Sequence, residues 1–266
     1  MLRRFIFRGG DVKPCIIVGS SPSAIILSNR LLPESYKVAI NNAWRIRSDF
    51  DASVFPSDFP KERQPDETFK GRTYTDIDYM PPINKAGGII YCGATMAFAA
   101  GYWALSHFST PLFGYYGCDM VYNAVDGKNH FYGNGTADPL REDISLRSLE
   151  ARSTRLFAYA LNNRKFIVNC SESHSSRLQF PRIGLDKLPE VIRQIPRLVK
   201  DPAWKDFVGL AKKNFVSEQR LGHRALKHDY CKLAKDATAE VIIIEMDEAW
   251  QIANQSLKNA LRALNL

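Results

Sequence analysis

The sequence predicts an α/β protein with a Rossmann-like, doubly wound and mainly parallel sheet, followed by a helical C-terminal extension. Three observations carry this prediction: short apolar runs alternate with helical stretches, the runs are continuous, and small polar residues follow them. Continuous apolar runs are typical of strands buried on both faces, and strands that alternate with helices favour a parallel sheet.

Six runs rich in β-favouring residues predict the strands. In chain order they are CIIV (15–18), KVAI (37–40), ASVF (52–55), GIIY (88–91), TPLFGYYG (110–117) and KFIVNC (165–170). Helices are expected between several of them, at 24–32, within 94–108 and within 141–163.

The pattern changes near residue 181 and predicts two regions. Residues 1–180 form the Rossmann-like domain, whereas prolines at 181, 189, 196 and 202 divide the chain beyond it into short helical pieces. Residues 229–264 then follow a largely helical pattern. We expect the region 181–266 to pack on the sheet or to form an oligomer contact.

The composition bounds the class of protein. A chain of 266 residues with 45% hydrophobic and 24% charged residues suits one globular domain, and without a long apolar run or a secretory signal we expect a cytoplasmic protein. Five cysteines without paired spacing argue against a disulfide framework and a structural zinc site.

The net charge of +8 indicates anionic partners: nucleic acid, a membrane surface or a phosphorylated substrate. The basic residues are scattered and no nucleic-acid-binding motif occurs, so nucleic acid is not favoured. Peripheral contact with the inner face of the membrane stays open.

Ligands in such sheets bind outside the carboxyl ends of the strands, so the residues that follow each predicted strand are candidate site residues. They are Gly19-Ser20-Ser21, Asn41-Asn42, Pro56-Ser57-Asp58, Cys92-Gly93-Ala94-Thr95, Gly117-Cys118-Asp119 and Ser171-Glu172-Ser173. The turn Gly19-Ser20-Ser21 precedes a predicted helix that has Pro22 in its first helical turn. The start of a helix favours an anion, so this turn is a candidate anion site. The alternative is a helix cap by Ser21 or Ser23 without a ligand.

Two nucleotide fingerprints are absent, since neither G-x-G-x-x-G nor G-x-x-x-x-G-K-[ST] occurs. Nicotinamide cofactors and P-loop nucleotide chemistry are therefore disfavoured. Asp76 and Asp78 have the D-x-D spacing of metal-dependent glycosyltransferases, but they follow a polar stretch and not a strand, so we predict no metal site.

The loop KNHFYGNGTADPLRED (128–143) carries the main catalytic candidate. His130 lies downstream of a strand end, where an imidazole with a near-neutral pKa can accept a proton from a substrate hydroxyl. The alternative is a loop histidine bonded to backbone. Tyrosines gather near the same edge, at 115, 116, 122 and 132, and phenols can stabilise a departing phosphate without a metal.

The order of these motifs resembles that of the bacterial sialyltransferases of glycosyltransferase family 42 and, more distantly, the related domain of motility-associated glycosylation proteins. The resemblance covers residues 15–173. In chain order the matching elements are Gly19-Ser20-Ser21-Pro22-Ser23 for Gly-x-Gly-Pro-Ser, Asn41, Cys92-Gly93 for a Ser-Gly turn, Tyr116-Gly117-Cys118-Asp119-Met120 for Ser-Gly-Ile-Asp-Phe, and His130-Phe131-Tyr132-Gly133 for His-Tyr-x-Gly.

The resemblance implies transfer of a nonulosonic, sialic-acid-like sugar from a CMP-activated donor to a glycan or glycolipid acceptor, with inversion and without a metal or other cofactor. His130 would be the general base, with Tyr122 and Tyr132 on the leaving phosphate. The implied nucleotide site contains Gly19, Ser20, Ser21, Asn41, Cys92, Gly93 and Thr95, to which the strand-end positions add Ser57 and Asp119.

The sequence departs from the family pattern at two of these positions, and it has no clear counterpart of the family's leaving-group tyrosine pair, for which Tyr122 and Tyr132 are the best matches. Ser20 stands where the family has asparagine, and Cys92 stands where it has serine. These departures favour the alternative from another class, a non-catalytic nucleotide-sugar-binding or structural protein on the same scaffold. A pterin-type diphosphokinase, dependent on Mg²⁺ and ATP, is a second enzyme alternative.

Overall fold

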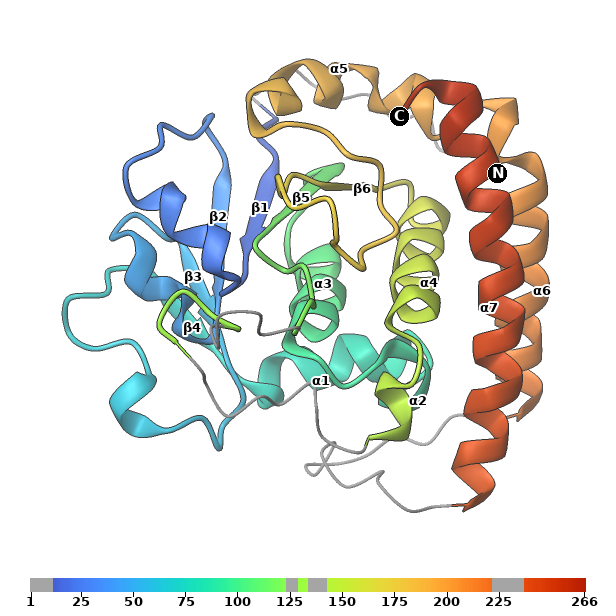
Figure 1. The fold of residues 1–266 in the computed structure, drawn as a ribbon, viewed down its shortest axis with the longest axis horizontal. Helices are drawn as coiled ribbons and strands as arrows, with labels where there is room; N and C mark the ends of the chain where they lie inside the picture. Colours follow the sequence, from blue (N-terminus) through green and yellow to red (C-terminus); the bar gives the residue numbers. More distant parts are fainter. Residues whose placement is uncertain (1–11, 123–128, 134–142, 222–236) are drawn as a thin grey trace.

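The computed structural model describes residues 12–122, 129–133, 143–221 and 237–266, and Figure 1 shows its ribbon. Within these ranges six parallel strands form one sheet with the order β4-β3-β2-β1-β5-β6. The strands are β1 (Cys15–Val18), β2 (Tyr36–Ile40), β3 (Ala52–Val54), β4 (Arg72–Tyr74), β5 (Leu112–Tyr116) and β6 (Phe166–Asn169).

Helices connect and cover these strands. The α-helices are α1 (Asp76–Lys85), α2 (Ile89–Cys92), α3 (Met96–His107), α4 (Leu149–Asn162), α5 (Leu188–Leu198), α6 (Lys205–Leu221) and α7 (Ala237–Leu264). Short 3₁₀ helices are η1 (Pro22–Ser28), η2 (Asn41–Ile46), η3 (Lys61–Arg63), η5 (Ile144–Leu146), η6 (Leu185–Lys187) and η7 (Pro202–Trp204). The predicted Rossmann-like α/β fold with a helical C-terminal extension is confirmed.

The chain reverses its winding direction between β1 and β5. It passes from β1 through β2 and β3 to β4 on one side, and then returns so that β5 and β6 lie on the other side of β1. Val18 is paired with Ala39 of β2 and with Tyr116 of β5. The carboxyl ends of β1 and β5 therefore form the switch point where ligands bind in sheets of this kind.

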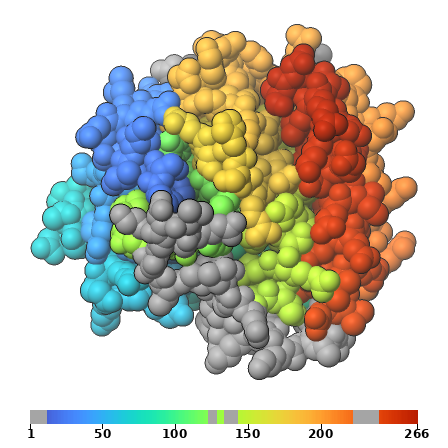
Figure 2. All heavy atoms as spheres, in the orientation of Figure 1, coloured from blue at the N-terminus to red at the C-terminus, as the bar shows by residue number. Residues whose placement is uncertain are grey.

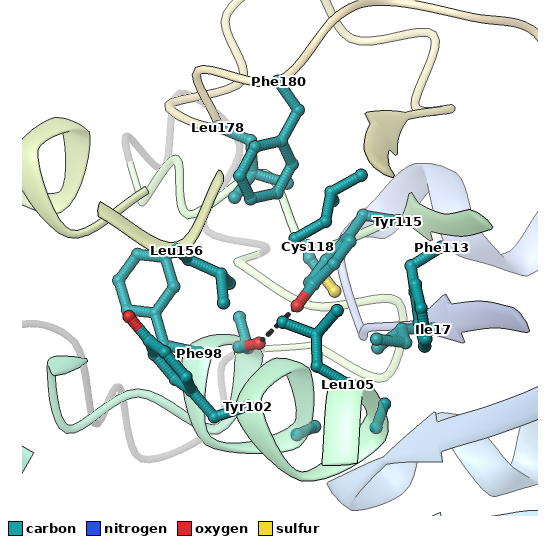
Figure 3. Packing of buried hydrophobic residues seen from close by; sticks show 14 of the residues in the cluster. Ile17, Phe98, Tyr102, Leu105, Phe113, Tyr115, Cys118, Leu156, Leu178 and Phe180 are labelled. Carbon is teal, nitrogen blue, oxygen red and sulfur yellow. Dashed lines mark hydrogen bonds between the residues drawn. The ribbon is translucent and has the colours of Figure 1, made fainter. Parts of the chain in front are cut away.

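Helices cover both sides of the sheet, and alternate side chains of β5 therefore pack against opposite helical layers. Tyr115 points to α3, where its hydroxyl donates to the carbonyl of Ala97 at 3.2 Å (Figure 3). A Cβ on the neighbouring Gly114 would instead contact Leu188 of α5 at 3.4 Å. This arrangement fixes α3 behind the switch point.

The prediction of a strand at GIIY (88–91) is wrong, because this stretch forms the single-turn helix α2. Gly88 and Gly93 flank the turn with φ values of 93° and 86°, and the residues between them are buried on all sides. A short apolar run has no periodicity that separates a strand from a buried helix. The sheet instead takes β4 from a polar stretch that carries no strand pattern.

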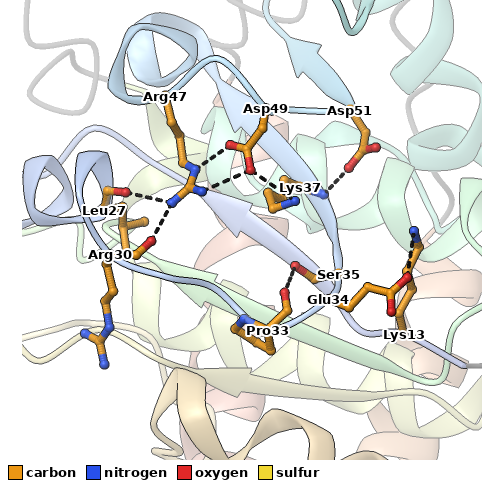
Figure 4. Close-up of polar contacts among 10 residues, drawn as sticks. All are labelled: Lys13, Leu27, Arg30, Pro33, Glu34, Ser35, Lys37, Arg47, Asp49 and Asp51. Carbon is orange, nitrogen blue, oxygen red and sulfur yellow. Dashed lines mark hydrogen bonds and ion pairs between the residues drawn. The ribbon is translucent and has the colours of Figure 1, made fainter.

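The expected helix after β1 is a 3₁₀ helix, η1, and Arg47 closes its end (Figure 4). The Arg47 guanidinium donates to the carbonyls of Leu27 at 2.7 Å and Arg30 at 2.9 Å. It also binds both carboxylate oxygens of Asp49, and this hydrogen bonding lowers the Asp49 pKa to about 2. The contact ties the first two crossover connections together.

The C-terminal region packs in two places. Helix α5 contacts β5, whereas α6 and α7 lie against α4 on the side of the molecule remote from β2 (Figures 1 and 2). Buried ion pairs join these layers: Arg155 of α4 donates to both oxygens of Glu218 of α6 at 2.8 and 2.7 Å. Arg152 of α4 lies 2.8 Å from Asp247 of α7. An oligomer contact stays a prediction.

None of the helices in the described ranges has the length and apolar character that a membrane span requires.

Candidate functional site

A cavity of about 510 Å³ opens at the carboxyl edge of the sheet, over the switch point. Turns after β1, β2, β3 and β5, the start of α3 and the segment 129–133 form its walls. The lining includes Gly19, Ser20, Ser21, Ile40, Asn41, Pro56, Asp58, Phe59, Pro60, Arg63, Thr95, Met96, Ala97, Gly117, Cys118, Asp119, Met120, Val121, Tyr122, Asn129, His130 and Tyr132.

Close contact between the β1 and β5 turns forms the floor of the cavity. The Gly19 amide donates to the Tyr116 carbonyl at 2.8 Å, and the Ser21 amide donates to the Gly117 carbonyl at 2.9 Å. Gly117 has φ of 68°, and a Cβ there would lie 2.7 Å from the Cβ of Ala24. Since a side chain at either glycine would separate the turns, both positions require glycine.

His130 is held against this floor by Ser20. The Ser20 hydroxyl lies 2.8 Å from His130 Nδ1, and the Ser20 carbonyl accepts from the Phe131 amide at 3.0 Å. Backbone hydrogen bonds between His130 and Gly133, at 3.0 and 3.1 Å, close the turn. The Tyr132 ring stacks on the imidazole with ring centroids 4.9 Å apart and planes 2° apart.

These contacts bear on which nitrogen of the His130 imidazole can accept a proton. If Nδ1 carries the proton and donates to Ser20, then Nε2 holds the free lone pair of a general base. Burial lowers the pKa of His130; hydrogen bonding to the Ser20 backbone opposes this change, and the charge of Arg63 adds to it. A lowered pKa favours the neutral imidazole, which is the form that a general base requires.

The start of α3 forms another wall. Thr95 caps this helix, since its hydroxyl accepts from the Phe98 amide at 3.2 Å. Thr95, Met96 and Ala97 all line the cavity. A helix of 12 residues directs the positive end of its dipole and its first amides toward the space in front of its N-terminus, an environment that favours an anion.

Two side-chain oxygens at strand ends in the wall are buried and have no hydrogen-bond partner among the described residues. They are Oδ1 of Asn41, after β2, and Oδ1 of Asp119, after β5. Asp119 is only 4% exposed. Buried acceptors are normally paired, so these oxygens fit a ligand that brings hydroxyl or amino donors.

The structure brings together nine of the twelve residues predicted for the site: Gly19, Ser20, Ser21, Asn41, Thr95, Asp119, Tyr122, His130 and Tyr132. Ser57, Cys92 and Gly93 are not among the lining residues. Tyr115, from the wider tyrosine group, is fully buried beneath the site.

The displaced residues have other roles. Because residues 89–92 form a helix and not a strand, Cys92 and Gly93 do not follow a strand end. The Cys92 thiol faces α4, where the Arg155 guanidinium donates to it at 3.5 Å. The Ser57 amide donates to Asp76 at 2.8 Å.

The D-x-D carboxylates bind backbone amides in this structure. Asp78 accepts from the Thr75 amide at 2.9 Å and completes a capping box at the start of α1, while Asp76 holds Ser57. Over the described ranges no group of three or more His, Cys, Asp or Glu side chains could hold a metal ion. Metal independence stays a prediction.

The sequence analysis missed the wall formed by Phe59, Pro60 and Arg63. This loop continues from the predicted strand end at 56–58, but no pattern indicates that it folds back. Tertiary hydrogen bonds hold it: Trp44 Nε1 donates to the Arg63 carbonyl at 2.9 Å, and Gln64 donates to the Phe59 carbonyl at 2.6 Å.

Comparison of the chain with protein-family models, with curated proteins and with solved structures finds no significant match.

Proposed function

We propose that this protein is a glycosyltransferase that moves a nonulosonic, sialic-acid-like sugar from a CMP-activated donor to a glycan acceptor, with inversion and without a metal ion. The observation that carries the proposal is the imidazole of His130, held by Ser20 in the cavity over the switch point of a parallel sheet. The order of sequence motifs supports the same class of reaction.

In the proposed reaction His130 Nε2 removes the proton from the acceptor hydroxyl. The acceptor oxygen forms a bond to the anomeric carbon while the bond from that carbon to the phosphate oxygen breaks. CMP leaves with the electron pair of the broken bond, and the proton stays on the imidazole. A single displacement of this kind inverts the anomeric centre.

The surrounding groups suit the charge that moves to the phosphate. The N-terminus of α3 and the hydroxyls of Ser20, Ser21, Tyr122 and Tyr132 line the same cavity and can donate to phosphate oxygens. Asn41 and Asp119 offer acceptors for the ribose or base. The net charge of +8 suits an anionic donor and an acceptor on lipid-linked glycans at the inner face of the membrane.

A non-catalytic nucleotide-sugar-binding protein is the second candidate. It is favoured by Ser20 in place of the family's asparagine and by the position of Cys92, whose thiol faces α4 and not the cavity. A binding protein of this kind would hold the donor without transferring the sugar.

The test compares His130→Ala with His174→Ala, which removes an exposed histidine outside the cavity lining. Sugar transfer from CMP-activated sialic acid is measured with a panel of glycan acceptors, and CMP affinity is measured by calorimetry. We expect His130→Ala to lose about 100-fold or more in turnover, the usual contribution of a general base, with CMP affinity changed less than threefold. Turnover that survives in His130→Ala contradicts the proposed base. CMP binding without turnover in the unmodified protein supports the binding-protein alternative.

A further inference from the structure

Arg63 is the one arginine or lysine among the described residues that line the cavity. In the described part of the chain its guanidinium forms no hydrogen bond or ion pair. Two other partly exposed arginines are paired: Arg30 with Glu172 at 2.6 Å and Arg177 with Glu150 at 2.7 Å. Among the described residues, Arg63 thus places a guanidinium without an ion-pair partner in the wall of the cavity.

Hydrogen bonds fix the backbone of Arg63, so its side chain extends from a defined point in the cavity wall. The Arg63 carbonyl accepts from Nε1 of the buried Trp44 at 2.9 Å, and the Arg63 amide donates to the Pro60 carbonyl at 2.9 Å. The residue ends η3, and the side chain is half-buried at the cavity. A ligand that binds this guanidinium therefore orders only the side chain, which keeps the entropic cost of binding low.

The guanidinium acts on the candidate base. Burial lowers the pKa of His130, and the charge of Arg63, which lines the same cavity, adds to this effect. Asp58 and Asp119 also line the cavity and carry the opposite charge. Asp119 is buried at the β5 end, whereas Asp58 is exposed in the same loop as Arg63.

We infer that Arg63 is a specificity-determining residue that binds an anionic oxygen of the substrate, from a phosphate or a carboxylate, beside His130. The inference rests on the proposed function and names the substrate class more narrowly. A ligand that has hydroxyl donors and an anionic oxygen can pair with both Asp119 and Arg63. A neutral sugar can pair only with Asp119.

The binding test uses Arg63→Met and Arg63→Lys, with Arg193→Met as the control for loss of one charge on the exposed face of α5. Calorimetry with cytidine, CMP and CMP-activated sialic acid separates the two sources of the anion. A charge-assisted hydrogen bond contributes roughly 10- to 100-fold in affinity, so we expect that loss in Arg63→Met and a smaller loss in Arg63→Lys. If the phosphate is bound, CMP affinity falls and cytidine affinity does not. If the carboxylate is bound, only the affinity for the activated sugar falls. Unchanged affinity for all three ligands overturns the inference.

A second readout does not depend on any nucleotide. The His130 titration is followed by NMR with and without inorganic phosphate, and thermal unfolding confirms that each variant is folded. Phosphate bound at Arg63 neutralises its charge and should raise the His130 midpoint in the unmodified protein but not in Arg63→Met. Removal of the arginine should itself raise that midpoint. If the protein binds no CMP compound but shows this phosphate effect, the proposed function fails while the anion site stands. An equal phosphate response in both proteins, or none in either, overturns the inference.

Discussion

Replacement of Gly101 by alanine tests the packing that sets α3 behind the site. Gly101 lies in the middle of α3, where alanine is normally better than glycine by about 1 kcal/mol. A Cβ at this position would collide with the Tyr115 hydroxyl and would lie 2.9 Å from Cδ2 of Leu156. Figure 3 shows Tyr115 and Leu156 in this part of the core.

The magnitude follows from three contributions to the free energy of unfolding. Overpacking of a filled core costs about 1–3 kcal/mol, and displacement of the Tyr115 hydroxyl loses a hydrogen bond of about 1 kcal/mol. Helix propensity returns about 1 kcal/mol. We therefore expect Gly101→Ala to lower the free energy of unfolding by about 1–3 kcal/mol.

A second substitution relieves the collision. The Cβ at position 101 would lie 3.4 Å from Cζ of Tyr115, an ordinary contact, so Tyr115→Phe removes the nearest blocking atom and leaves only the flexible end of Leu156 to move. The double variant should return to within about 1 kcal/mol of the unmodified protein, because the lost hydrogen bond and the gained helix propensity offset each other. Urea unfolding of the single and double variants gives the coupling energy.

Gly209→Ala on α6 is the matched control, because a Cβ there meets nothing within 4 Å. It should stabilise the protein by about 0.5–1 kcal/mol. If Gly101→Ala stabilises to the same extent, or if Tyr115→Phe does not rescue it, the packing of α3 against β5 is not as described.

Three other substitutions test the layers around the site. Arg155→Met leaves the buried carboxylate of Glu218 unpaired and should lower the free energy of unfolding by about 3–5 kcal/mol; a loss below about 1 kcal/mol in urea would argue against this ion pair. Burial raises the pKa of Asp247 to about 6. The folded protein therefore keeps a proton on this carboxyl up to a higher pH than the unfolded chain, which loses the proton near pH 4. The free energy of unfolding should fall by up to about 3 kcal/mol as the pH rises from about 4 to about 6. In Asp247→Asn, the denaturant midpoint should no longer decrease with pH over this range. An unchanged decrease would show that another group causes the pH dependence. Gly19→Ala places a Cβ against the Gly117 carbonyl and should abolish ligand binding in calorimetry; unchanged affinity would show that the two turns need no close contact.

Continuous apolar runs identify the strands that are buried on both faces. β1, β2 and β5 have such runs because helices cover both sides of the sheet there, and their local sequence contains the necessary information. The run at 88–91 is equally apolar but lies inside the helical layer, where burial on all sides gives the same pattern. Tertiary position decides between the two structures.

The same distinction between local sequence and tertiary position applies to the candidate site. Turns directly after true strands, such as Gly19–Ser21 and Asn41, reach the cavity because parallel strands end at one edge. His130 reaches it from a distant loop, and the glycine and aromatic content of that loop provides the signal. Arg63 has no such signal, since a contact with Trp44 brings it to the cavity.

Calorimetry of the unmodified protein tests the central claim most directly, with CMP, CDP, UDP, GDP, ATP and NAD, each with and without Mg²⁺. The account predicts that CMP binds, that its affinity does not change with Mg²⁺, and that binding raises the melting temperature through linkage. Binding of ATP that requires Mg²⁺ would support the diphosphokinase alternative, and folded protein that binds none of these nucleotides would contradict the account.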